Sequence, residues 1–515
     1  MNPLDSSMEI TGKNFIGDRL SGLGDERYQT FDPLQNIENK TLFISATTAE
    51  LEEAVALADA AFPIYCELSD AQRASFLRAI GEEILNIGND LIDIYCKETG
   101  LDRVRAIGER DRTLYQLQLF AKMIETENWR NNITEAALPA RTPKPKPSLT
   151  KTHIPIGPIA VFGASNFPLA YSTAGGDTAS ALAVGCPVIV KSHPMHSGCG
   201  AVVATAIIRA AQKTAMPNGV FSNLNAKSYE LSHDLVKHPK IKAVGFTGSF
   251  SGGSALQKTV FNREEPIPFF AEMGSINPIA ILPQALEKDA EKIADKIGNS
   301  IAIGAGQFCT QPGLLITIDG EHTDHFIKEL TKVLEGLGQQ SMIHPELKKN
   351  YVRQSEKINR LEKTVEILAS KDQWDNQFVK PKLSIISGEQ FMANPQFQEE
   401  VFGPFSLLVK CKDLKEIEQL VLHLKGQLTG AIFAPATDFE YIHPLIQAFK
   451  SKVGRLLLND VPTGVEVTTA MTHGGPYPAA SDSRFTAVGP ASIYRWIRPI
   501  TYQNWPNELL KKIIN

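Results

Sequence analysis

The segment GAGQFCTQPGLLITI, residues 304–318, places one cysteine, Cys309, among three glycines. A cysteine thiolate is a strong nucleophile. A cysteine that only packs in a core behaves as a small apolar side chain and needs no glycines beside it. Gly304, Gly306 and Gly313 therefore predict that another group approaches this sulfur closely, although a buried structural cysteine is the commoner interpretation of such a segment taken alone.

Glu272 and Asn166 offer two further kinds of chemistry. Glu272, in FFAEMGSINP, lies between apolar runs, a setting suited to a general base, with a capping or salt-bridged carboxylate as the alternative. Asn166, in FGASNFPLAY, follows an expected strand end, where the loops of a parallel sheet gather around ligands. Its amide could donate to a developing oxyanion, although asparagine beside Phe-Pro is also typical of a turn.

Other residues are suited to binding a ligand with phosphates and hydroxyls. KAVGFTGSFSGGSALQKTV places Gly248, Ser249 and Gly253 between an expected strand and a helix beginning near Ser251. Free N–H groups at a helix start attract phosphate, but the segment is not G-x-G-x-x-G, and a plain strand-to-helix turn is equally typical. Lys191 closes CPVIVK and could bind ribose or phosphate, or be merely solvated.

The elements that must position these residues alternate between strand and helix. IGPIAVFGAS, CPVIVKSH and IKAVGFTGS are β-rich runs separated by helical segments, and a second alternating region spans about 273–450. Such alternation predicts parallel sheets with crossover helices, here two α/β units in tandem. The Pro/Lys segment 140–150 predicts a linker or protruding arm, and the tail from 481 an edge strand, offered perhaps to a partner subunit.

Length and composition exclude several function classes. A chain of 515 residues predicts two or three domains. Its net charge of −5 and lack of a long basic run predict no nucleic-acid and no membrane-surface partner. The first residues, MNPLDSSMEITGKNF, lack signal- and transit-peptide features. The six cysteines show neither C-x-x-C pairs nor zinc spacing, which predicts reduced thiols, a cytoplasmic location and no metal site.

Six motifs gain specificity from their order along the chain: SNFP, VIVK, FTGSFSGG, AEMGSINP, GQFC and EEVFGP. Together they resemble the aldehyde dehydrogenase superfamily over about residues 30–505. The resemblance implies a Rossmann-like NAD(P)-binding domain, an α/β catalytic domain, a β oligomerisation arm, and a homodimer or homotetramer. The implied boundaries are 1–137 and 156–271 for the cofactor domain with 448–480 returning to it, 272–447 for the catalytic domain, and 138–155 and 481–515 for the arm.

The resemblance also implies roles for individual residues. Cys309 would attack the aldehyde carbon to give a thiohemiacetal, and the Asn166 amide with the Cys309 N–H would hold the oxyanion. After hydride passes to the nicotinamide, Glu272 would activate the water that hydrolyses the thioester. The implied cofactor contacts are Lys191 and Glu400 with ribose hydroxyls, Phe402 near the nicotinamide ribose, and Gly248, Ser249 and Gly253 along the pyrophosphate.

Longer segments, FGASNFPLAYSTAGGDTASALAVGCPVIVKSHPMHSG and MTHGGPYPAASDSRFTAVG, resemble the α-ketoglutaric semialdehyde dehydrogenases and related NADP-accepting enzymes. That subgroup implies oxidation of 2,5-dioxopentanoate to 2-oxoglutarate, with a broad-specificity medium- or long-chain aldehyde dehydrogenase as the alternative. The substrate carboxylate would need a basic partner, for which Arg455 and Arg484 are candidates. Phe167 is expected near the substrate, and so is His473, which with the following glycines replaces a Phe-Gly-Gly.

Departures from the family pattern bear on the cofactor. Pro194 stands where NAD-preferring relatives often carry a carboxylate for the adenosine ribose, so NADP is expected to be used, together with NAD. Lys191 and Lys227 would then attract the 2'-phosphate. A cofactor-free cysteine hydrolase or acyltransferase, with Cys309 paired to a histidine, is the alternative from another class. A non-catalytic structural relative is the third.

Overall fold

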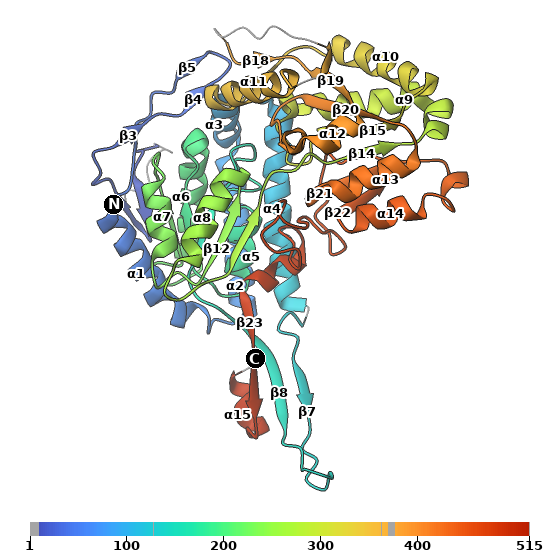
Figure 1. The fold of residues 1–515 in the computed structure, drawn as a ribbon. Coiled ribbons are helices and arrows are strands. Elements are labelled where there is room, and N and C mark those ends of the chain that lie inside the picture. Colours follow the sequence, from blue (N-terminus) through green and yellow to red (C-terminus); the bar gives the residue numbers. More distant parts are fainter. Residues whose placement is uncertain (1–9, 127, 362, 369–375, 514–515) are drawn as a thin grey trace.

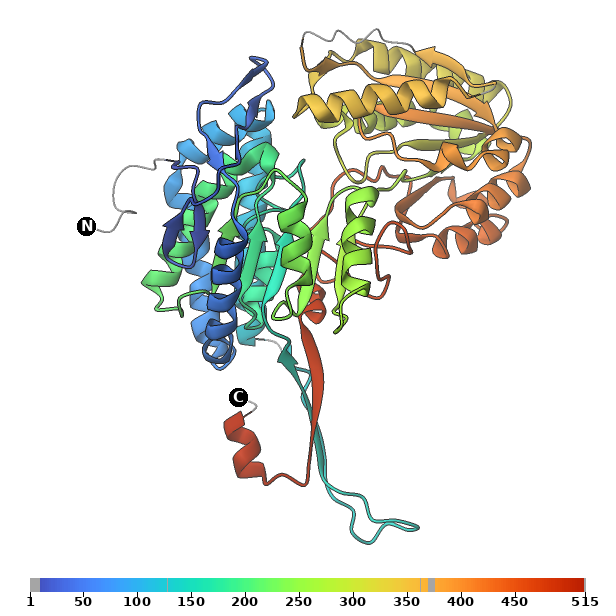
Figure 2. The same cartoon turned by 60° about the vertical axis from the view of Figure 1, so that its left-hand side comes forward.

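The computed structural model describes residues 10–126, 128–361, 363–368 and 376–513. It contains two α/β units, one built around each large sheet, and a narrow β arm that projects away from them (Figures 1 and 2). The start of the chain, which the sequence analysis found free of targeting features, lies largely outside the described residues. Within the described ranges no helix combines the length and apolarity that crossing a bilayer requires.

The first sheet has seven strands in the order β13-β12-β9-β10-β11-β1-β2. Their bounds are β1 (Asn14–Ile16), β2 (Arg19–Ser21), β9 (Ile159–Phe162), β10 (Val188–Lys191), β11 (Phe221–Leu224), β12 (Ala243–Thr247) and β13 (Phe269–Glu272). Strands β9 to β13 are parallel, and the chain moves from β9 first to one side and then to the other. Ligand crevices form at such a reversal, at the carboxyl ends of the strands. Both Lys191 and Glu272 end their strands at this edge.

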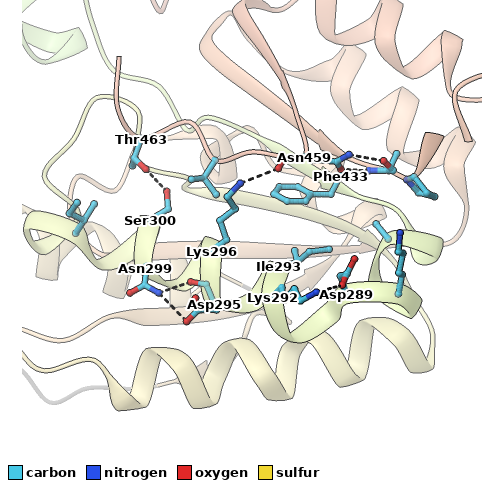
Figure 3. A pocket seen from close by; sticks show the side chains of 16 residues that line it. Asp289, Lys292, Ile293, Asp295, Lys296, Asn299, Ser300, Phe433, Asn459 and Thr463 are labelled. Carbon is cyan, nitrogen blue, oxygen red and sulfur yellow. Dashed lines mark hydrogen bonds and ion pairs between the residues drawn. The ribbon is translucent and has the colours of Figure 1, made fainter. Parts of the chain in front are cut away.

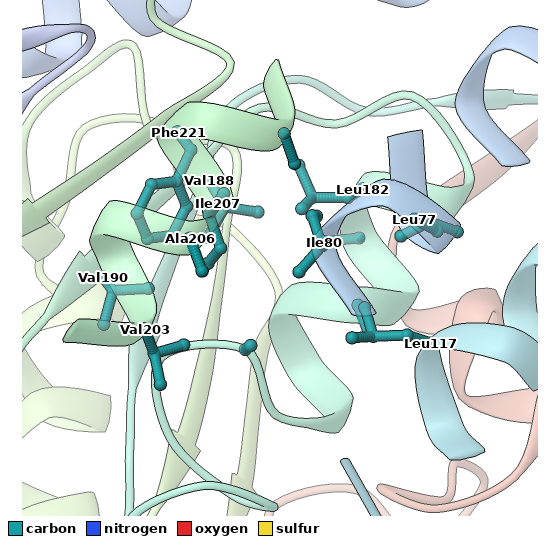
Figure 4. Packing of buried hydrophobic residues seen from close by; sticks show 14 of the residues in the cluster. Leu77, Ile80, Leu117, Leu182, Val188, Val190, Val203, Ala206, Ile207 and Phe221 are labelled. Carbon is teal, nitrogen blue, oxygen red and sulfur yellow. The ribbon is translucent and has the colours of Figure 1, made fainter. Parts of the chain in front are cut away.

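Helices cover both faces of this sheet. They are α1 (Thr48–Tyr65), α2 (Asp70–Ile87), α3 (Asn89–Thr99), α4 (Arg103–Thr126), α5 (Gly176–Ala183), α6 (Ser197–Lys213), α7 (Glu230–Lys237) and α8 (Phe250–Phe261). Figure 4 shows one core layer, in which Leu77 and Ile80 of α2 and Leu182 of α5 pack with Val203 of α6 and Phe221 of β11. Each such side chain, once buried, stabilises the fold by about 1.5–3 kcal/mol.

The second sheet also has seven strands, in the order β17-β19-β20-β15-β14-β21-β22. Its strands are β14 (Ile279–Ile281), β15 (Leu314–Ile318), β17 (Val365–Leu368), β19 (Lys382–Ser387), β20 (Phe405–Cys411), β21 (Gln427–Phe433) and β22 (Val453–Leu458). Its helices are α9 (Pro283–Ala302), α10 (Glu321–Gly336), α11 (Pro345–Asn359), α12 (Gly388–Ala393), α13 (Leu414–His423) and α14 (His443–Lys450). Only β17 runs antiparallel to its neighbour. The predicted tandem of α/β units is thus confirmed.

One predicted boundary is wrong for β22. The sequence analysis returned residues 448–480 to the cofactor domain, but β22 pairs in parallel with β21 and extends the second sheet. The apolar run after Gly454 fits that sheet because Leu457 packs into its core cluster. Farther along, Met273 N–H donates to Ala479 O at 2.8 Å, so the end of that range does contact the first unit.

The arm is a three-stranded sheet in the order β23-β8-β7, formed by β7 (Ile133–Glu135), β8 (Leu149–Pro155) and β23 (Ile497–Gln503), and followed by α15 (Asn507–Ile513). The predicted tail strand therefore exists, but it pairs with β8 of its own chain along its whole length. The segment just before it packs on the main body, since Trp496 is fully buried and its Nε1 donates to Ser180 Oγ at 2.8 Å.

Short two-stranded ribbons complete the described fold: β3 (Arg27–Tyr28) with β6 (Phe43–Ile44), β4 (Phe31–Asp32) with β5 (Ile37–Glu38), and β16 (Gln340–Ser341) with β18 (Phe378–Val379).

A buried carboxylate holds the N-terminus of α6. The two oxygens of Glu98, from α3, accept the N–H groups of Gly198 and Cys199, each at 2.8 Å. A negative charge at this end of a helix also interacts favourably with the helix dipole. Glu98 therefore joins α3 to the N-terminus of α6, the helix that follows the strand ending at Lys191.

Replacing Glu98 by alanine is expected to lower the free energy of unfolding by about 3 kcal/mol, because two buried N–H groups lose their acceptor. Urea or thermal denaturation followed by circular dichroism measures the change. Glu82→Ala is the matched control, since Glu82 is exposed and pairs with Lys213 at 3.0 Å on the surface; such pairs contribute about 0–1 kcal/mol. Equal losses in the two variants would contradict the role given to Glu98.

Candidate active site

The loop that carries Cys309 depends on its glycines for a local reason. After α9 the chain makes a short helical turn, η2 (Ile303–Gly306), in which Gly304, Ala305 and Gly306 have φ of 58°, 54° and 65°. A Cβ on Gly306 would lie 2.3 Å from the carbonyl carbon of Gly403. These glycines predicted that another group approaches the sulfur closely. For Gly306 the approaching group is the protein's own backbone.

His473 joins Cys309 and Glu272 into one cluster. The Cys309 Sγ lies 3.6 Å from His473 Nε2, and Glu272 Oε1 lies 2.7 Å from the same nitrogen. The side chains of Glu272 and His473 are 3% and 1% exposed. Glu272 ends β13 of the first sheet, Cys309 precedes β15 of the second, and His473 comes from the segment after β22. The site therefore lies where the two units meet.

Burial raises the pKa of the Cys309 thiol well above its usual range, and the negative charges of Glu272 and Glu400 raise it further. The positive charge of Arg112 opposes this shift. A thiol of this kind stays protonated at neutral pH until a base takes the proton. The Glu272 carboxylate and the His473 imidazole are the two bases already beside it.

Asn166 lies in a tightly held loop. Its Nδ2 donates to Gln307 O at 2.9 Å, which uses one of the two amide hydrogens and leaves one for a ligand. Glu109 of α4 accepts the N–H groups of Leu169 and Ala170 at 2.8 and 3.0 Å, so the loop is fixed on its far side. The sequence analysis did not identify Glu109, because its pairing with this loop exists only in the fold.

Asn277 fixes the backbone of the Cys309 loop. Its Nδ2 donates to Cys309 O at 2.9 Å and to Gln311 O at 2.8 Å, and its Oδ1 accepts from Thr429 Oγ1 at 2.8 Å. Asn277 is fully buried and adopts φ of 43°. Asn277 lies in the motif AEMGSINP, but no role was predicted for it. An Asn-Pro pair directly before the apolar run IAIL was the signal available in the sequence.

Two of the residues predicted to contact the cofactor, Lys191 and Glu400, are partly buried charged groups. Burial lowers the pKa of Lys191 to about 8, and among the described residues no carboxylate counteracts this shift. Burial raises the pKa of Glu400 to about 7, and its carboxylate accepts only a long bond, 3.4 Å, from Ser275 N. An unpaired ammonium and an unpaired carboxylate fit a ligand that offers ribose hydroxyls and phosphates, as a dinucleotide does.

The remaining predicted cofactor residues lie around α8 and after Glu400. Ser249 Oγ accepts the Gly252 N–H at 3.2 Å and so caps α8, which begins at Phe250, close to the expected start. A Cβ on Gly253 would lie 2.7 Å from Met273 Sδ, so this glycine brings α8 against the residue after β13. Phe402 is half-buried, next to Glu400. Of the acidic pair, Glu399 faces outward and meets Lys357 at 2.6 Å, while Glu400 faces inward.

A group of basic side chains lies beyond Lys191. Burial lowers the pKa of His193, and the positive charges of Lys191 and His344 lower it further. Burial lowers the pKa of His344 to about 4, and the positive charge of Lys227 contributes to this shift. Lys227 and His344 thus come close to the Lys191 end of the crevice, and His344 comes from the second unit. Sequence reasoning named Lys227 and missed His344.

Aromatic rings and Arg105 pack beside the Cys309 loop, next to Phe308. The Phe167 ring centroid lies 5.2 Å from that of Tyr171 and 5.5 Å from that of Phe308. Arg105 stacks on Phe167 and Phe308 at 4.4 and 4.5 Å.

Two further arginines lie within electrostatic range of the Cys309 thiol. Arg112 acts on the pKa of Cys309 and donates to Tyr171 Oη at 3.2 Å, and Arg455 interacts with both Cys309 and Tyr171. Each carries a buried Nε without a hydrogen-bond partner among the described residues. Arg484, the other candidate, is 79% exposed and pairs with Asp482. The structure brings Arg455 to the site and adds Arg112.

A separate pocket lies between α9 and the segment after β22 (Figure 3). Lys296 donates there to Asn459 O at 3.2 Å, and Ser300 Oγ lies 2.8 Å from Thr463 Oγ1. Neither Cys309 nor Glu272 lines this pocket, so it is distinct from the cluster described above.

Comparison with known proteins agrees with this geometry. Residues 21–477 match the model of the aldehyde dehydrogenase family. The chain is 42% identical to alpha-ketoglutaric semialdehyde dehydrogenase 2 of Azospirillum brasilense, over 98% of this chain and 96% of that protein. It is 38% identical to alpha-ketoglutaric semialdehyde dehydrogenase of Acinetobacter baylyi, with the same coverage. A 1-pyrroline-5-carboxylate dehydrogenase from Thermus with bound NAD shares the fold, with a TM-score of 0.82 at 20% identity over 95% of this chain and 92% of that chain.

The fold, the nucleophile and the full-length match define a class of enzyme that oxidises aldehydes with a nicotinamide dinucleotide. The chain belongs to the aldehyde dehydrogenase family.

Asn277→Ala is expected to lower kcat by about 10- to 100-fold, because two buried carbonyls of the Cys309 loop lose a donor worth about 1–3 kcal/mol. The rate at which iodoacetamide alkylates Cys309 should change in parallel, which separates misplacement of the thiol from a defect elsewhere. Asn299→Ala is the control, since Asn299 is exposed and bonds only within α9. Unchanged kcat and alkylation in Asn277→Ala would contradict the positioning role.

Proposed function

We propose that this enzyme oxidises 2,5-dioxopentanoate to 2-oxoglutarate. The observation that carries the proposal is the pair Arg112 and Arg455, two arginines with buried, unpartnered Nε groups on the substrate side of Cys309. The relatives named above for alpha-ketoglutaric semialdehyde support the same substrate.

The charge pattern of the site fits a short oxo acid. A planar guanidinium binds a carboxylate through two parallel hydrogen bonds, and two guanidiniums can share one carboxylate and its neighbouring 2-oxo group. Phe167 and Tyr171 would contact the methylene groups between the acid end and the aldehyde. The other guanidinium nitrogens of both arginines already donate to Tyr171 Oη or to backbone carbonyls, so an apolar aldehyde would leave the two Nε groups without an acceptor, which disfavours a broad medium- or long-chain specificity.

The residues around Cys309 can carry out the attack on the aldehyde and the hydrolysis of the thioester. Glu272 or His473 takes the thiol proton, and the Cys309 sulfur attacks the aldehyde carbon to give a thiohemiacetal. The Asn166 amide and the Cys309 N–H hold the oxyanion. A nicotinamide dinucleotide held by the residues named below would supply the hydride acceptor for that carbon. Glu272 then takes a proton from water, whose oxygen attacks the resulting thioester, and the carboxylic acid and the Cys309 thiolate separate.

We further propose that NADP is accepted, together with NAD. Lys191 and Lys227 lie around the region where Pro194 replaces a carboxylate, and their positive charges favour a 2'-phosphate, to which the neutral His344 can donate a hydrogen bond. Ribose hydroxyls would pair with Lys191 at one end of the dinucleotide and with Glu400 at the other, with Phe402 beside the second ribose. Gly248, Ser249 and Gly253 would lie along the pyrophosphate, at the start of α8.

The domain roles, assembly and location stay proposals as well. The first sheet would bind the cofactor, the second would carry Cys309, and the arm would join two or four copies of the chain. The arm leaves β23 and β7 as open edges, and β22 is an edge strand with Leu456 and Leu458 36% and 50% exposed; uncovered edges of this kind favour pairing with another chain. All six cysteines are free, in keeping with a reducing cytoplasm.

The proposed reaction is tested by following reduced nicotinamide with purified enzyme, 2,5-dioxopentanoate or hexanal, and NAD or NADP. Turnover of the dioxo acid is expected with both cofactors and should be lost in Cys309→Ala. Arg112→Gln and Arg455→Gln are each expected to lower kcat/KM for the dioxo acid by about 100-fold, the effect of removing one partner of a buried charge pair, and to change it far less for hexanal. Arg484→Gln is the matched surface control. Preference for hexanal in the unaltered enzyme would refute the substrate assignment.

The cofactor role of Glu400 predicts a pH dependence. Its raised pKa, about 7, means that the carboxylate is charged above and neutral below this pH, and only the charged form accepts from both ribose hydroxyls. The KM for the cofactor is therefore expected to rise about tenfold from pH 8 to pH 6. Glu400→Gln should raise the KM for the cofactor at all pH values and remove its rise between pH 8 and pH 6. Glu399→Gln should keep the pH dependence of this KM. An unchanged profile in Glu400→Gln would assign the titration to another group.

A further inference from the structure

Side-chain atoms of Cys309, His473 and Glu272, a sulfur, a nitrogen and an oxygen, lie around one position where a metal ion could bind. The three atoms all lie within 4.8 Å of one another, and this set is the group of potential metal-binding side chains found among the described residues. Thiolate, imidazole and carboxylate are the ligands that Zn²⁺ takes in proteins. We propose that the cofactor-free enzyme binds Zn²⁺ reversibly through these three side chains, and that zinc bound there inhibits the dehydrogenase.

The sulfur–nitrogen separation already fits a tetrahedral zinc ion, and the nitrogen–oxygen separation fits after a small movement. Bonds of about 2.3 Å to sulfur and about 2.1 Å to nitrogen and oxygen place sulfur and nitrogen ligands about 3.6 Å apart, and nitrogen and oxygen ligands about 3.4 Å apart. The Sγ–Nε2 distance is already 3.6 Å. The Nε2–Oε1 distance of 2.7 Å has to open by about 0.7 Å. Both oxygens of Glu272 are buried and make no aligned hydrogen bond among the described residues, and their contacts with His473 and Cys309 are ones that the ion would replace, so the carboxylate can make that movement.

Strand pairing or hydrogen bonds fix the backbone at each of the three metal-binding residues. Glu272 lies in register with Thr247 of β12 and bridges to Ala480 on its other side. Cys309 is fixed through its carbonyl by Asn277. His473 N–H donates to Thr486 Oγ1 at 2.9 Å, and its carbonyl accepts the Ala487 N–H at 2.8 Å. Because the backbone of all three residues is already fixed, binding of the ion costs little conformational entropy.

The charges favour a dication at this point. A thiolate and the Glu272 carboxylate would place two negative charges within 4.8 Å, with a neutral imidazole between them. Zn²⁺ neutralises both and displaces the thiol proton to solvent. Arg112 and Arg455 oppose entry of a cation from the substrate side, whereas Glu400 acts on Cys309 from the side proposed for the cofactor. The ion is therefore expected to enter before the dinucleotide binds.

Bound zinc would block the proposed reaction in two ways. The sulfur lone pair that attacks the aldehyde would be shared with the metal, and the Glu272 oxygen that takes the proton from water would be a ligand. A fourth position, facing the channel, would be left for water. This inhibition rests on the proposed function, but zinc binding itself does not, so the two can be tested separately.

The binding test uses the full chain without cofactor, titrated with ZnCl₂ in a calorimeter. One zinc per chain is expected, and His473→Phe should weaken binding by at least about 100-fold, at the top of the range seen when a partner outside the ligand shell is lost. His443→Phe is the matched control, because His443 is exposed on α14 and meets only Gln447. Co²⁺ in place of Zn²⁺ should give thiolate-to-metal charge-transfer absorption that Cys309→Ser and Glu272→Gln weaken. Circular dichroism checks that each variant folds.

The reactivity test measures alkylation of Cys309 by iodoacetamide, which needs no substrate or cofactor. Zinc is expected to slow alkylation at least tenfold, EDTA to restore it, and His473→Phe to remove the effect. Aldehyde oxidation should be lost and recovered under the same additions. Equal zinc affinity in the unaltered chain and His473→Phe, or alkylation that zinc does not slow, would overturn the proposal. Zinc protection without aldehyde oxidation would keep the metal site and refute the proposed function instead.

Discussion

The active site depends on keeping the Cys309 thiol and the Glu272 carboxylate in contact, although they belong to different sheets. The connection from β13 to β14 makes this possible. Ser275 Oγ and Ile276 N–H both donate to Gln427 Oε1, at 2.9 and 2.8 Å, so the connection is fastened to the start of β21. Asn277 then reaches from the same connection to the Cys309 carbonyl. A shift between the two units would therefore have to break buried hydrogen bonds before it could separate the nucleophile from its base.

Burial is the dominant influence on the charged groups around this contact. It raises the pKa of Cys309 and of Glu400, and it lowers that of Lys191 and of His193. All four shifts favour the neutral form, because a buried charge without a partner is unfavourable. The free enzyme thus holds groups whose charge is stabilised only by a ligand of opposite charge or by a hydrogen-bond donor. Binding of a substrate, a dinucleotide or a metal ion is therefore expected to change the protonation state of these groups.

Supporting residues divide between those that a sequence can suggest and those that it cannot. Cys309, Asn166 and Lys191 each lie at the end of a recognisable strand or in a glycine-rich segment, so pattern and resemblance both point to them. Glu98 and Glu109 lie within ordinary amphipathic helices, where a carboxylate is usually solvated. Only the packing of α3 and α4 against the loops after β9 and β10 turns them into buried acceptors. The local sequence around Glu98 and Glu109 does not indicate which distant backbone groups these carboxylates contact.

The sequence by itself determined the two α/β units, the order of the motifs and the family, because strand and helix periodicity and the spacing of chemical residues are local properties. It did not place β22 correctly, since strand pairing is decided by which sheet has an open edge. It also left His473 as one of several substrate contacts and found no metal-ligand spacing. Only the tertiary structure brings His473 between Cys309 and Glu272, across 164 residues from Cys309. Such a cluster depends on how two sheets pack, and side-chain geometry across that junction is fixed by the whole fold.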